Sequence, residues 1–239
     1  HQVQGTITYL HQQGCCQMPP DQERVTDTLI SLGMSPNVGA ILIVSLGCEG
    51  TDHERMYKEL SATGKHVEII HIQELGGVSK AIQLGTDIAR KLVIEISGLQ
   101  RQPVDVSKIV MAIKCGASDT TSGMASNCVI GYVADKLVDL GATVIFGETT
   151  EFLGGEHLLA RRAVNKEVAD KIYEIVTNME NRAKSIGCDM RKGQPTPGNI
   201  AGGLSSIEEK SLGAIVKSGT RPIQGVLEYP QHVTDQKDL

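Results

Sequence analysis

Aromatic residues are scarce in this sequence, which contains no Trp, two Phe and five Tyr. The formal net charge is -5, and the basic residues form no stripe or block. Proteins that bind nucleic acid rely on a basic surface, and often on aromatic rings that stack with bases. The composition therefore predicts that no nucleic acid is a partner.

Long apolar runs are missing as well. No run approaches the roughly 20 residues that a membrane-spanning helix needs, and no signal-peptide pattern opens the chain. Six cysteines in 239 residues are too few for a disulfide scaffold. We therefore expect a soluble, cytoplasmic protein that has free thiols and does not associate with membranes.

Three common catalytic motifs are absent too. No G-x-G-x-x-G follows a strand-like run, and no G-x-S-x-G is present. The glycine-rich stretch 198–203 lacks the Lys-Ser/Thr ending of a phosphate-binding P-loop. Nucleotide cofactors and serine-hydrolase chemistry are therefore disfavoured.

What the sequence does contain is an alternation of strand-like and helix-like segments, which is typical of α/β folds with a mostly parallel sheet. The expected strands are 6–10, 37–44, 67–72, 108–113, 142–146 and 226–229. The expected helices are 21–32, 52–60, a long one between Gly77 and Ile96, 124–140, 155–187 and 205–217. Helix 124–140 is expected to bury Val129, Val133, Leu137 and Leu140, and 194–203 is expected to be a loop.

A linker is expected between Gly98 and Ser107, which divides the chain into a small α/β domain, 1–102, and a second domain, 103–239. The chain opens at His1 without Met and ends in a polar tail. We therefore expect it to be a fragment of a longer polypeptide, truncated at the C-terminal end of the second domain.

Two clusters of polar side chains follow successive strands of the second domain. Residues 114–119 follow strand 108–113, and residues 146–157 follow strand 142–146. In open α/β sheets, ligands bind beyond the carboxyl ends of the strands. We therefore expect a thiol, an Asp, three Glu and a His to converge on a metal or acid/base site.

The second cluster carries Glu148, Glu151, Glu156 and His157. Carboxylates and imidazole are suitable ligands for Fe, Mn or Mg. As an alternative, Glu151 and Glu156 lie in the first turn of the next helix and stabilise its positive end, while His157 packs or caps.

The first cluster surrounds Cys115 and Asp119 with small hydroxyl residues such as Ser118 and Ser122. Backbone N–H groups and hydroxyls ahead of a helix can bind an anionic substrate group. An ordinary loop in which Asp119 or Ser122 caps the helix remains open. Cys48 and the segment 14–17 are functional thiols or buried structural ones.

The segment Lys114–Asp119, followed by Ser122 and Gly123, resembles the Cys-Gly-Gly-Ser-Asp…Ser-Gly motif of the altronate and galactarate dehydratases. Ala117 stands where that family usually has its second Gly. Further matching segments cover nearly the whole chain, at 37–49, 147–163, 197–204 and 209–214.

This resemblance implies a fold of two consecutive Rossmann-like parallel-sheet units, the second atypical. It also implies a metal-dependent hydro-lyase that dehydrates a sugar acid, such as altronate or galactarate, to a 2-keto-3-deoxy acid. The metal is expected to be Fe²⁺, with Mn²⁺ as the alternative, held by Glu148, Glu151 and His157, with Cys115 and Glu156 as alternative further ligands. The catalytic residues would be Glu156, Asp119 and Cys115, and the substrate-binding residues Ser118, Ser122, Asn127 and Asn199.

The resemblance also suggests partners. We expect a small hydroxy-acid substrate and a homodimer, with dimerisation as a role for domain 1–102. The small β domain of single-chain family members is missing, so a separate β-domain subunit or a missing domain is expected. Two alternatives remain: the large subunit of a sulfolactate sulfo-lyase, and a non-catalytic fragment or assembly module of such an enzyme.

Overall fold

The computed structural model describes residues 3–11 and 13–227 of the 239-residue chain. The described residues form two compact units that meet in sequence between Gln102 and Pro103. We call residues 3–102 the N-terminal unit and residues 103–227 the C-terminal unit.

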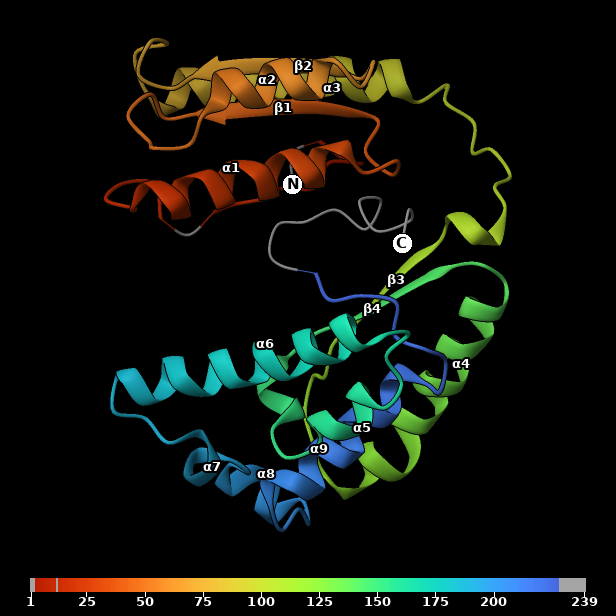
Figure 1. Ribbon diagram of the computed structural model, residues 1–239. Helices are drawn as coiled ribbons and strands as arrows, with labels where there is room; N and C mark the ends of the chain where they lie inside the picture. Colours follow the sequence, from red (N-terminus) through yellow and green to blue (C-terminus); the bar gives the residue numbers. More distant parts are fainter. Residues whose placement is uncertain (1–2, 12, 228–239) are drawn as a thin grey trace. The chain divides into compact units, whose positions relative to one another are not determined.

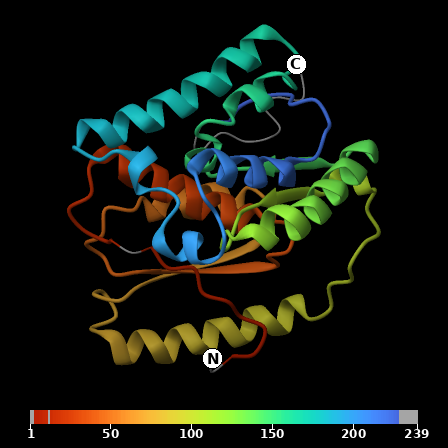
Figure 2. The same ribbon diagram turned by 90° about the horizontal axis from the view of Figure 1, so that it is seen from below.

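The N-terminal unit is a small three-layer structure around two parallel strands, β1 (Ala40–Ser45) and β2 (His66–His71). Its helices are α1 (Pro19–Met34), α2 (His53–Ser61) and α3 (Val78–Ile96). Figure 2 shows α1 and α3 on opposite sides of the two strands.

Strand alternation explains these layers. Ile43 and Val67 point into a core shared with Ile30 of α1 and Leu60 of α2. Their neighbours on the other face, such as Leu42, lie against α3 at Gly85. Successive residues of a strand face opposite sides of a sheet, so one apolar strand supports helices on both faces.

The expected strand at 6–10 is wrong, because this segment has no regular secondary structure. Ile7, Tyr9 and Leu10 are exposed, and β1 and β2 pair only with each other among the described residues. An alternating sequence forms a strand only where a neighbouring strand offers hydrogen bonds.

The C-terminal unit contains a second parallel pair, β3 (Val110–Ile113) and β4 (Thr143–Phe146), preceded by a 3₁₀ turn, η1 (Val106–Lys108). Its main helices are α4 (Asn127–Asp139), α6 (Lys166–Ser185) and α9 (Ile207–Ile215) (Figure 1). Short elements join them: a π-helical turn η2 (Ser122–Ser126), η3 (Thr149–Phe152), α5 (Glu156–Ala160), α7 (Met190–Gly193), α8 (Pro197–Ala201) and η4 (Val216–Ser218).

One apolar cluster holds this unit together. Phe152 and Leu153, at the end of η3, pack with Ile172 of α6 and Ile215 of α9. Leu153 has no exposed surface. Each fully buried aliphatic side chain of this kind stabilises the fold by roughly 1.5–3 kcal/mol. The cluster therefore fixes the loop after β4, where the candidate site lies.

The expected single helix 155–187 is divided into α5 and α6. Ala163 forms an isolated parallel bridge with Ile223, and Asn165 caps α6 by accepting the Val168 N–H. Helical periodicity runs through 155–187 in the sequence. At the break, however, the backbone N–H and C=O groups form hydrogen bonds with Ile223, which is 60 residues further along the chain.

The core face expected for helix 124–140 is also wrong. Val129, Val133 and Leu140 are exposed, and Leu137 is only partly buried. Instead α4 buries Asn127, Gly131 and Ala134. A side chain at Gly131 would collide with the Val216 carbonyl oxygen, so the helix packs through its smallest residues.

Smaller differences concern the C-terminal third. The expected loop 194–203 contains the short helix α8, whose Thr196 and Asn199 form a capping box. Residues 226–227 form no strand, and residues 228–229 of that expected strand lie outside the described residues.

The α/β class and the parallel strand pairing are confirmed. Each sheet has only two strands in the part of the chain that the structure describes, so the Rossmann-like description is not confirmed. Among residues 3–11 and 13–227, no helix combines the length and apolar composition that crossing a bilayer requires.

Candidate functional site

A fully buried cation lies in the C-terminal unit. Lys217 belongs to η4, and none of its surface is exposed. An unpaired ammonium in such a place would be strongly destabilising. Its position is fixed because η4 packs closely on Gly131 of α4. Arg162 adds hydrogen bonds to Ser218, at 2.8 Å to its hydroxyl and 3.1 Å to its carbonyl oxygen.

The Lys217 ammonium has three partners from the two strand-end clusters. Its Nζ lies 2.9 Å from Cys115 Sγ, 3.1 Å from Glu148 Oε2 and 3.2 Å from Glu151 Oε2. We call these four residues the lysine-centred cluster. It joins the loop after β3, the loop after β4 and η4. The parallel pairing of β3 and β4 places their carboxyl ends side by side, which brings the first two loops together.

Glu148 has an unusual backbone conformation. Its φ angle is +70°, in the left-handed region that side chains other than Gly rarely adopt. Such a residue costs about 1–3 kcal/mol and persists only when its surroundings hold it. The Cys115 N–H donates to Glu148 Oε2 at 2.6 Å, and Lys217 donates to the same oxygen. The left-handed backbone conformation of Glu148 therefore directs its carboxylate into the cluster, where these hydrogen bonds hold it.

Burial and hydrogen bonding oppose each other in setting the protonation of the cluster. Burial by itself raises the pKa of Glu148, but the hydrogen bonds from Cys115 N–H and Lys217 outweigh it, so the pKa is lowered. Burial by itself lowers the pKa of Lys217, but its hydrogen bonds to Cys115 and Glu148 leave the pKa raised. Glu148 is therefore a carboxylate and Lys217 an ammonium at neutral pH.

Burial raises the pKa of the Cys115 thiol to about 11, with Lys217 opposing the rise and Glu151 adding to it. The thiolate is the reactive form of cysteine, so a pKa of about 11 instead of 9.0 leaves about 100-fold less of it at pH 8. In metal-free protein we expect Cys115 to react with iodoacetamide about 100-fold more slowly than a cysteine in a short peptide. Mass spectrometry of timed samples measures this rate, and the exposed Cys188 is the internal control. Equal rates for Cys115 and the peptide would contradict the assignment.

The donor atoms of the cluster suit a divalent metal. Cys115, Glu148 and Glu151 each offer one ligand atom, and these atoms lie within 4.8 Å of one another. One sulfur and two carboxylate oxygens are a plausible set for a transition metal. The Lys217 ammonium lies within hydrogen-bond distance of all three, so a metal here would have to displace it.

A pocket of about 340 Å³ lies next to the cluster and is lined by residues of η2, α4, α9 and the loops before them. Glu151 does not itself line the pocket, but two residues that do, Ser118 and Lys210, lie close to its carboxylate. Ser118 Oγ is 3.5 Å and Lys210 Nζ is 4.0 Å from Glu151 Oε1. The Lys210 ammonium also donates to Gln194 Oε1 at 2.7 Å. A small anion in this pocket would therefore meet a cation and a hydroxyl directly beside Glu151.

Three of the substrate-binding residues expected from the sequence line this pocket, namely Ser118, Ser122 and Asn127. Asn127 is buried, and its side chain donates to the Gly213 carbonyl at 2.9 Å. Asn199 does not line the pocket. Its side chain instead donates to the carbonyl oxygen of Ser118, a lining residue, at 2.8 Å. Asn199 thus holds the Ser118 loop in place.

Asp119 also lines the pocket, but its carboxylate has other partners. Oδ1 accepts from Thr121 Oγ1 and from the Ser122 N–H, both at 2.7 Å. The Thr121 hydroxyl is the main cause of its lowered pKa, and the Ser122 N–H is the next. This geometry corresponds to the helix-capping alternative for Asp119.

His157 and Glu156 lie on α5 and are not part of the metal-type group formed by Cys115, Glu148 and Glu151 in the described residues. His157 is exposed. Glu156 has one buried carboxylate oxygen, Oε2, without a hydrogen-bond partner among the described residues. The structure thus brings together Cys115, Glu148 and Glu151, and leaves His157 and Glu156 apart from them.

Sequence reasoning missed the two lysines of the site. Lys217 directly follows the apolar run 214–216, and a charged residue in such a setting is a recognisable signal of a buried partner. Lys210 lies on α9 one turn from the buried Ile207 and Ala214, which is a weaker signal.

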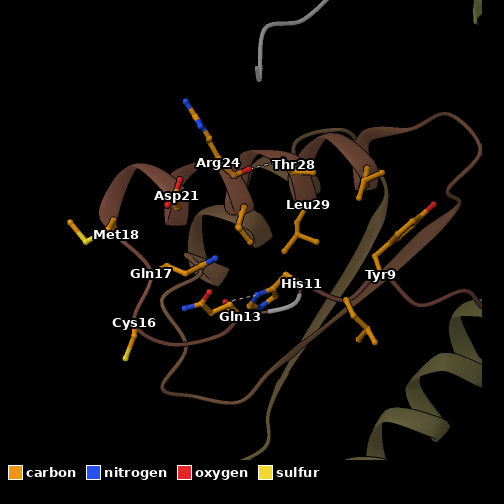
Figure 3. A pocket seen from close by; sticks show the side chains of 13 residues that line it. Tyr9, His11, Gln13, Cys16, Gln17, Met18, Asp21, Arg24, Thr28 and Leu29 are labelled. Carbon is orange, nitrogen blue, oxygen red and sulfur yellow. Dashed lines mark hydrogen bonds between the residues drawn. The ribbon is translucent and has the colours of Figure 1, made fainter. Parts of the chain in front are cut away.

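A larger hollow, of about 550 Å³, lies in the N-terminal unit between the segment 9–18 and α1 (Figure 3). His11 and Gln13 come from that segment, and Leu29 points toward them from α1. Arg24 points to the other side of the helix. The hollow is lined by aliphatic and amide groups together with polar residues such as His11, Cys16, Asp21 and Arg24, and it contains none of the metal-type side-chain groups found in the described residues. The lysine-centred cluster is therefore the stronger candidate for chemistry.

Comparison with family models gives two matches. The model described as "D-galactarate/Altronate dehydratase, C-terminal" matches residues 106–238. The model described as "D-galactarate dehydratase/Altronate hydrolase, second domain" matches residues 1–97. The two matches fall on either side of the boundary between the two units.

Curated relatives agree with these matches. The chain is 40% identical over 236 residues to the (2R)-sulfolactate sulfo-lyase subunit beta of Chromohalobacter salexigens, covering 97% of this chain and 59% of the relative. It is 32% identical to the altronate dehydratase of Bacillus subtilis, covering 94% of this chain and 45% of the relative. It is 33% identical to the galactarate dehydratase (L-threo-forming) of Escherichia coli, covering 87% and 41%. The chain thus spans about half the length of the curated relatives it matches.

Proposed function

Because this chain belongs to the D-galactarate/altronate dehydratase family, we propose that it is the part of a lyase that carries out β-elimination on a hydroxy acid. In this reaction a proton leaves C2, the electron pair of that bond forms the C2=C3 double bond, and a substituent leaves C3. The enol that remains tautomerises to a keto acid. The observation that carries the proposal is the lysine-centred cluster beside a pocket whose lining includes the partly buried cation Lys210 as well as the carboxylates of Asp119 and Glu209.

Glu151 is our candidate for the base. Its carboxylate is adjacent to two pocket-lining groups, Ser118 Oγ and Lys210 Nζ. Glu148 is less suited to this role, because its lowered pKa makes it a weaker base. Glu148 instead keeps negative charge beside Lys217.

Lys210 is our candidate for binding the substrate carboxylate. Its side chain is only 12% exposed, so water screens its charge less than at the surface. As the proton leaves C2, negative charge accumulates on the substrate carboxylate, and a fixed ammonium stabilises that charge. Ser118, Ser122 and Asn127 would orient the substrate hydroxyls. Asp119 and Asn199 would hold the loops that carry these groups.

Lys217 is buried and acts through its neighbours, so it is a positioning residue. It holds Cys115, Glu148 and Glu151 in one place and compensates the charge of two carboxylates. A divalent metal that displaced the Lys217 ammonium would be held by Cys115, Glu148 and Glu151 Oε2, with Glu151 Oε1 left beside Ser118 and Lys210. It would supply Lewis-acid assistance to the departing group, with Fe²⁺ as the first candidate and Mn²⁺ as the second.

Water leaving a sugar acid such as altronate or galactarate is the first candidate reaction, because the matching family models are described as dehydratases. Sulfite leaving sulfolactate is the second, favoured by the 40% identity to a sulfo-lyase subunit. The two differ chemically, since hydroxide needs acid assistance to leave whereas sulfite leaves as a stable anion. That relative is named as a subunit, so we also propose that this chain assembles with a second polypeptide or copy of itself.

The test is an anaerobic assay of the purified chain with Fe²⁺ or Mn²⁺, alone and with the sulfo-lyase's partner subunit. Galactarate and altronate are scored by keto-acid formation, and sulfolactate by sulfite release. We expect turnover of one substrate class and its loss in Glu151→Gln, but not in Glu167→Gln, an exposed position on α6. If no substrate turns over under any of these conditions, the chain is a non-catalytic assembly module and the proposal fails.

A further inference from the structure

Two histidines meet at the carboxyl edge of the other sheet, in the N-terminal unit. His71 is the last residue of β2, paired in register with Ser45, the last residue of β1. His53 is the first residue of α2, which follows the loop after β1. This edge is the ligand-binding edge of parallel sheets.

The two imidazole rings contact each other edge to face, with centroids 4.9 Å apart and planes at 66°. Glu54 lies beside them. One ligand atom from each of His53, Glu54 and His71 falls within 4.8 Å of the others. All three residues are in the N-terminal unit, so this group does not depend on the lysine-centred cluster.

The two nitrogens of His53 have different surroundings. Nε2 lies 3.9 Å from Glu54 Oε1. Nδ1 is buried and has no hydrogen-bond partner among the described residues, and Glu49 Oε1 is 3.9 Å from it. Glu49 itself is held in place, because its other oxygen accepts the Gly47 N–H at 2.7 Å. Histidines that bind metals usually donate a hydrogen bond from their second nitrogen to a carboxylate, and Glu49 is the carboxylate close enough to accept one after a small movement of the His53 ring.

We propose that His53, His71 and Glu54 form a site for a divalent transition metal, with Zn²⁺ as the ion that fits best. Two imidazoles and one carboxylate are a set that binds zinc with a fourth position open to water or a ligand. Zinc imposes no strong geometric preference of its own, so it suits a site assembled from a strand end and a helix start. Glu49 positions the His53 ring.

The charge at this edge and the exposure of Glu54 are consistent with cation binding. The N-terminal end of α2 carries partial positive charge, which disfavours a cation by roughly 0.3–1 kcal/mol. Three carboxylates close to that end, Glu49, Asp52 and Glu54, offset this effect. The Glu54 side chain is 80% exposed, so it can swing toward the imidazoles without disturbing the core.

The experiment is zinc titration calorimetry on the full chain carrying Cys115→Ser and Glu148→Gln, which removes the other metal-type group. We expect one zinc ion per chain. His53→Gln and His71→Gln are each expected to weaken binding at least 100-fold, and Glu49→Gln about 10-fold through the lost positioning contact. His66→Gln is the matched control, because His66 also contacts two carboxylates, Glu68 and Glu95, but lies outside the group.

A cobalt spectrum provides a second measurement, which reports directly on the type of ligand atom. Co²⁺ bound through nitrogen and oxygen gives visible bands without an intense thiolate charge-transfer band. We expect such a spectrum, and its loss in His71→Gln. Unchanged zinc affinity in both histidine variants would overturn the proposal, as would a thiolate band, which would place the metal on cysteines instead.

Discussion

Replacing Lys217 by Met is expected to lower the free energy of unfolding by about 3–5 kcal/mol, because removing one partner of a buried ion pair leaves the other charges uncompensated. The side chains of Glu148 and Glu151 are 22% and 11% exposed, so water can screen them only in part. Urea unfolding measures the change. Lys192→Met is the matched control, because that lysine is 86% exposed and its removal should cost at most about 1 kcal/mol.

Two further variants separate the charge effect from lost packing. Adding Glu148→Gln and Glu151→Gln to Lys217→Met should restore part of the stability, because the uncompensated carboxylates are then gone. A single Lys217→Met protein as stable as the wild type would show that the cluster is not held by this ammonium.

The same substitution also bears on the metal. Without Lys217, the cations that remain near the donor atoms of the cluster, among the described residues, are Lys114, 3.9 Å from Glu148 Oε1, and Lys210, 4.0 Å from Glu151 Oε1. We expect Lys217→Met to bind Fe²⁺ or Mn²⁺ more tightly than the wild type and to regain stability when the metal is added. If the wild type and Lys217→Met bound the metal equally tightly, the metal would be bound at a site other than the lysine-centred cluster.

Glu151→Gln is expected to lower kcat by about 10³-fold with little change in KM, within the range that a general base contributes. The glutamine keeps the shape of the side chain and its contacts to Ser118 and Lys210, but it cannot accept a proton from C2. Exchange of the C2 proton with deuterated solvent isolates this step, and we expect the variant to lose it.

Glu156→Gln is the informative comparison, because the sequence alone assigned catalysis to Glu156. That residue lies on α5, apart from the lysine-centred cluster, so we expect its variant to keep most of the exchange rate. Loss of exchange in Glu156→Gln with exchange retained in Glu151→Gln would reverse the assignment of the base.

Local patterns predicted most of the regular structure. The apolar runs that became β1 to β4 and the periodicity of α1, α2 and α3 were readable because each depends on residues close in sequence. Three structural predictions that were wrong have a common cause. Segment 6–10 lacked a neighbouring strand, helix 155–187 was interrupted by Ile223, and α4 packed through Gly131 instead of through its valines. Each of these outcomes depended on a segment that is distant in the chain.

The sequence predicted that Cys115, Glu148 and Glu151 would meet, although it placed Asp119, Glu156 and His157 in the same group, and the structure leaves those three outside it. Each residue that does meet follows one of two successive strands, and parallel pairing brings the carboxyl ends of these strands together whatever the details of packing. The tertiary structure alone decided which cation they share. Lys217 is 102 positions from Cys115, and it reaches the cluster because η4 packs onto the small residues of α4. The position of a buried charge depends on how distant elements dock, and no local pattern of residue types encodes that docking.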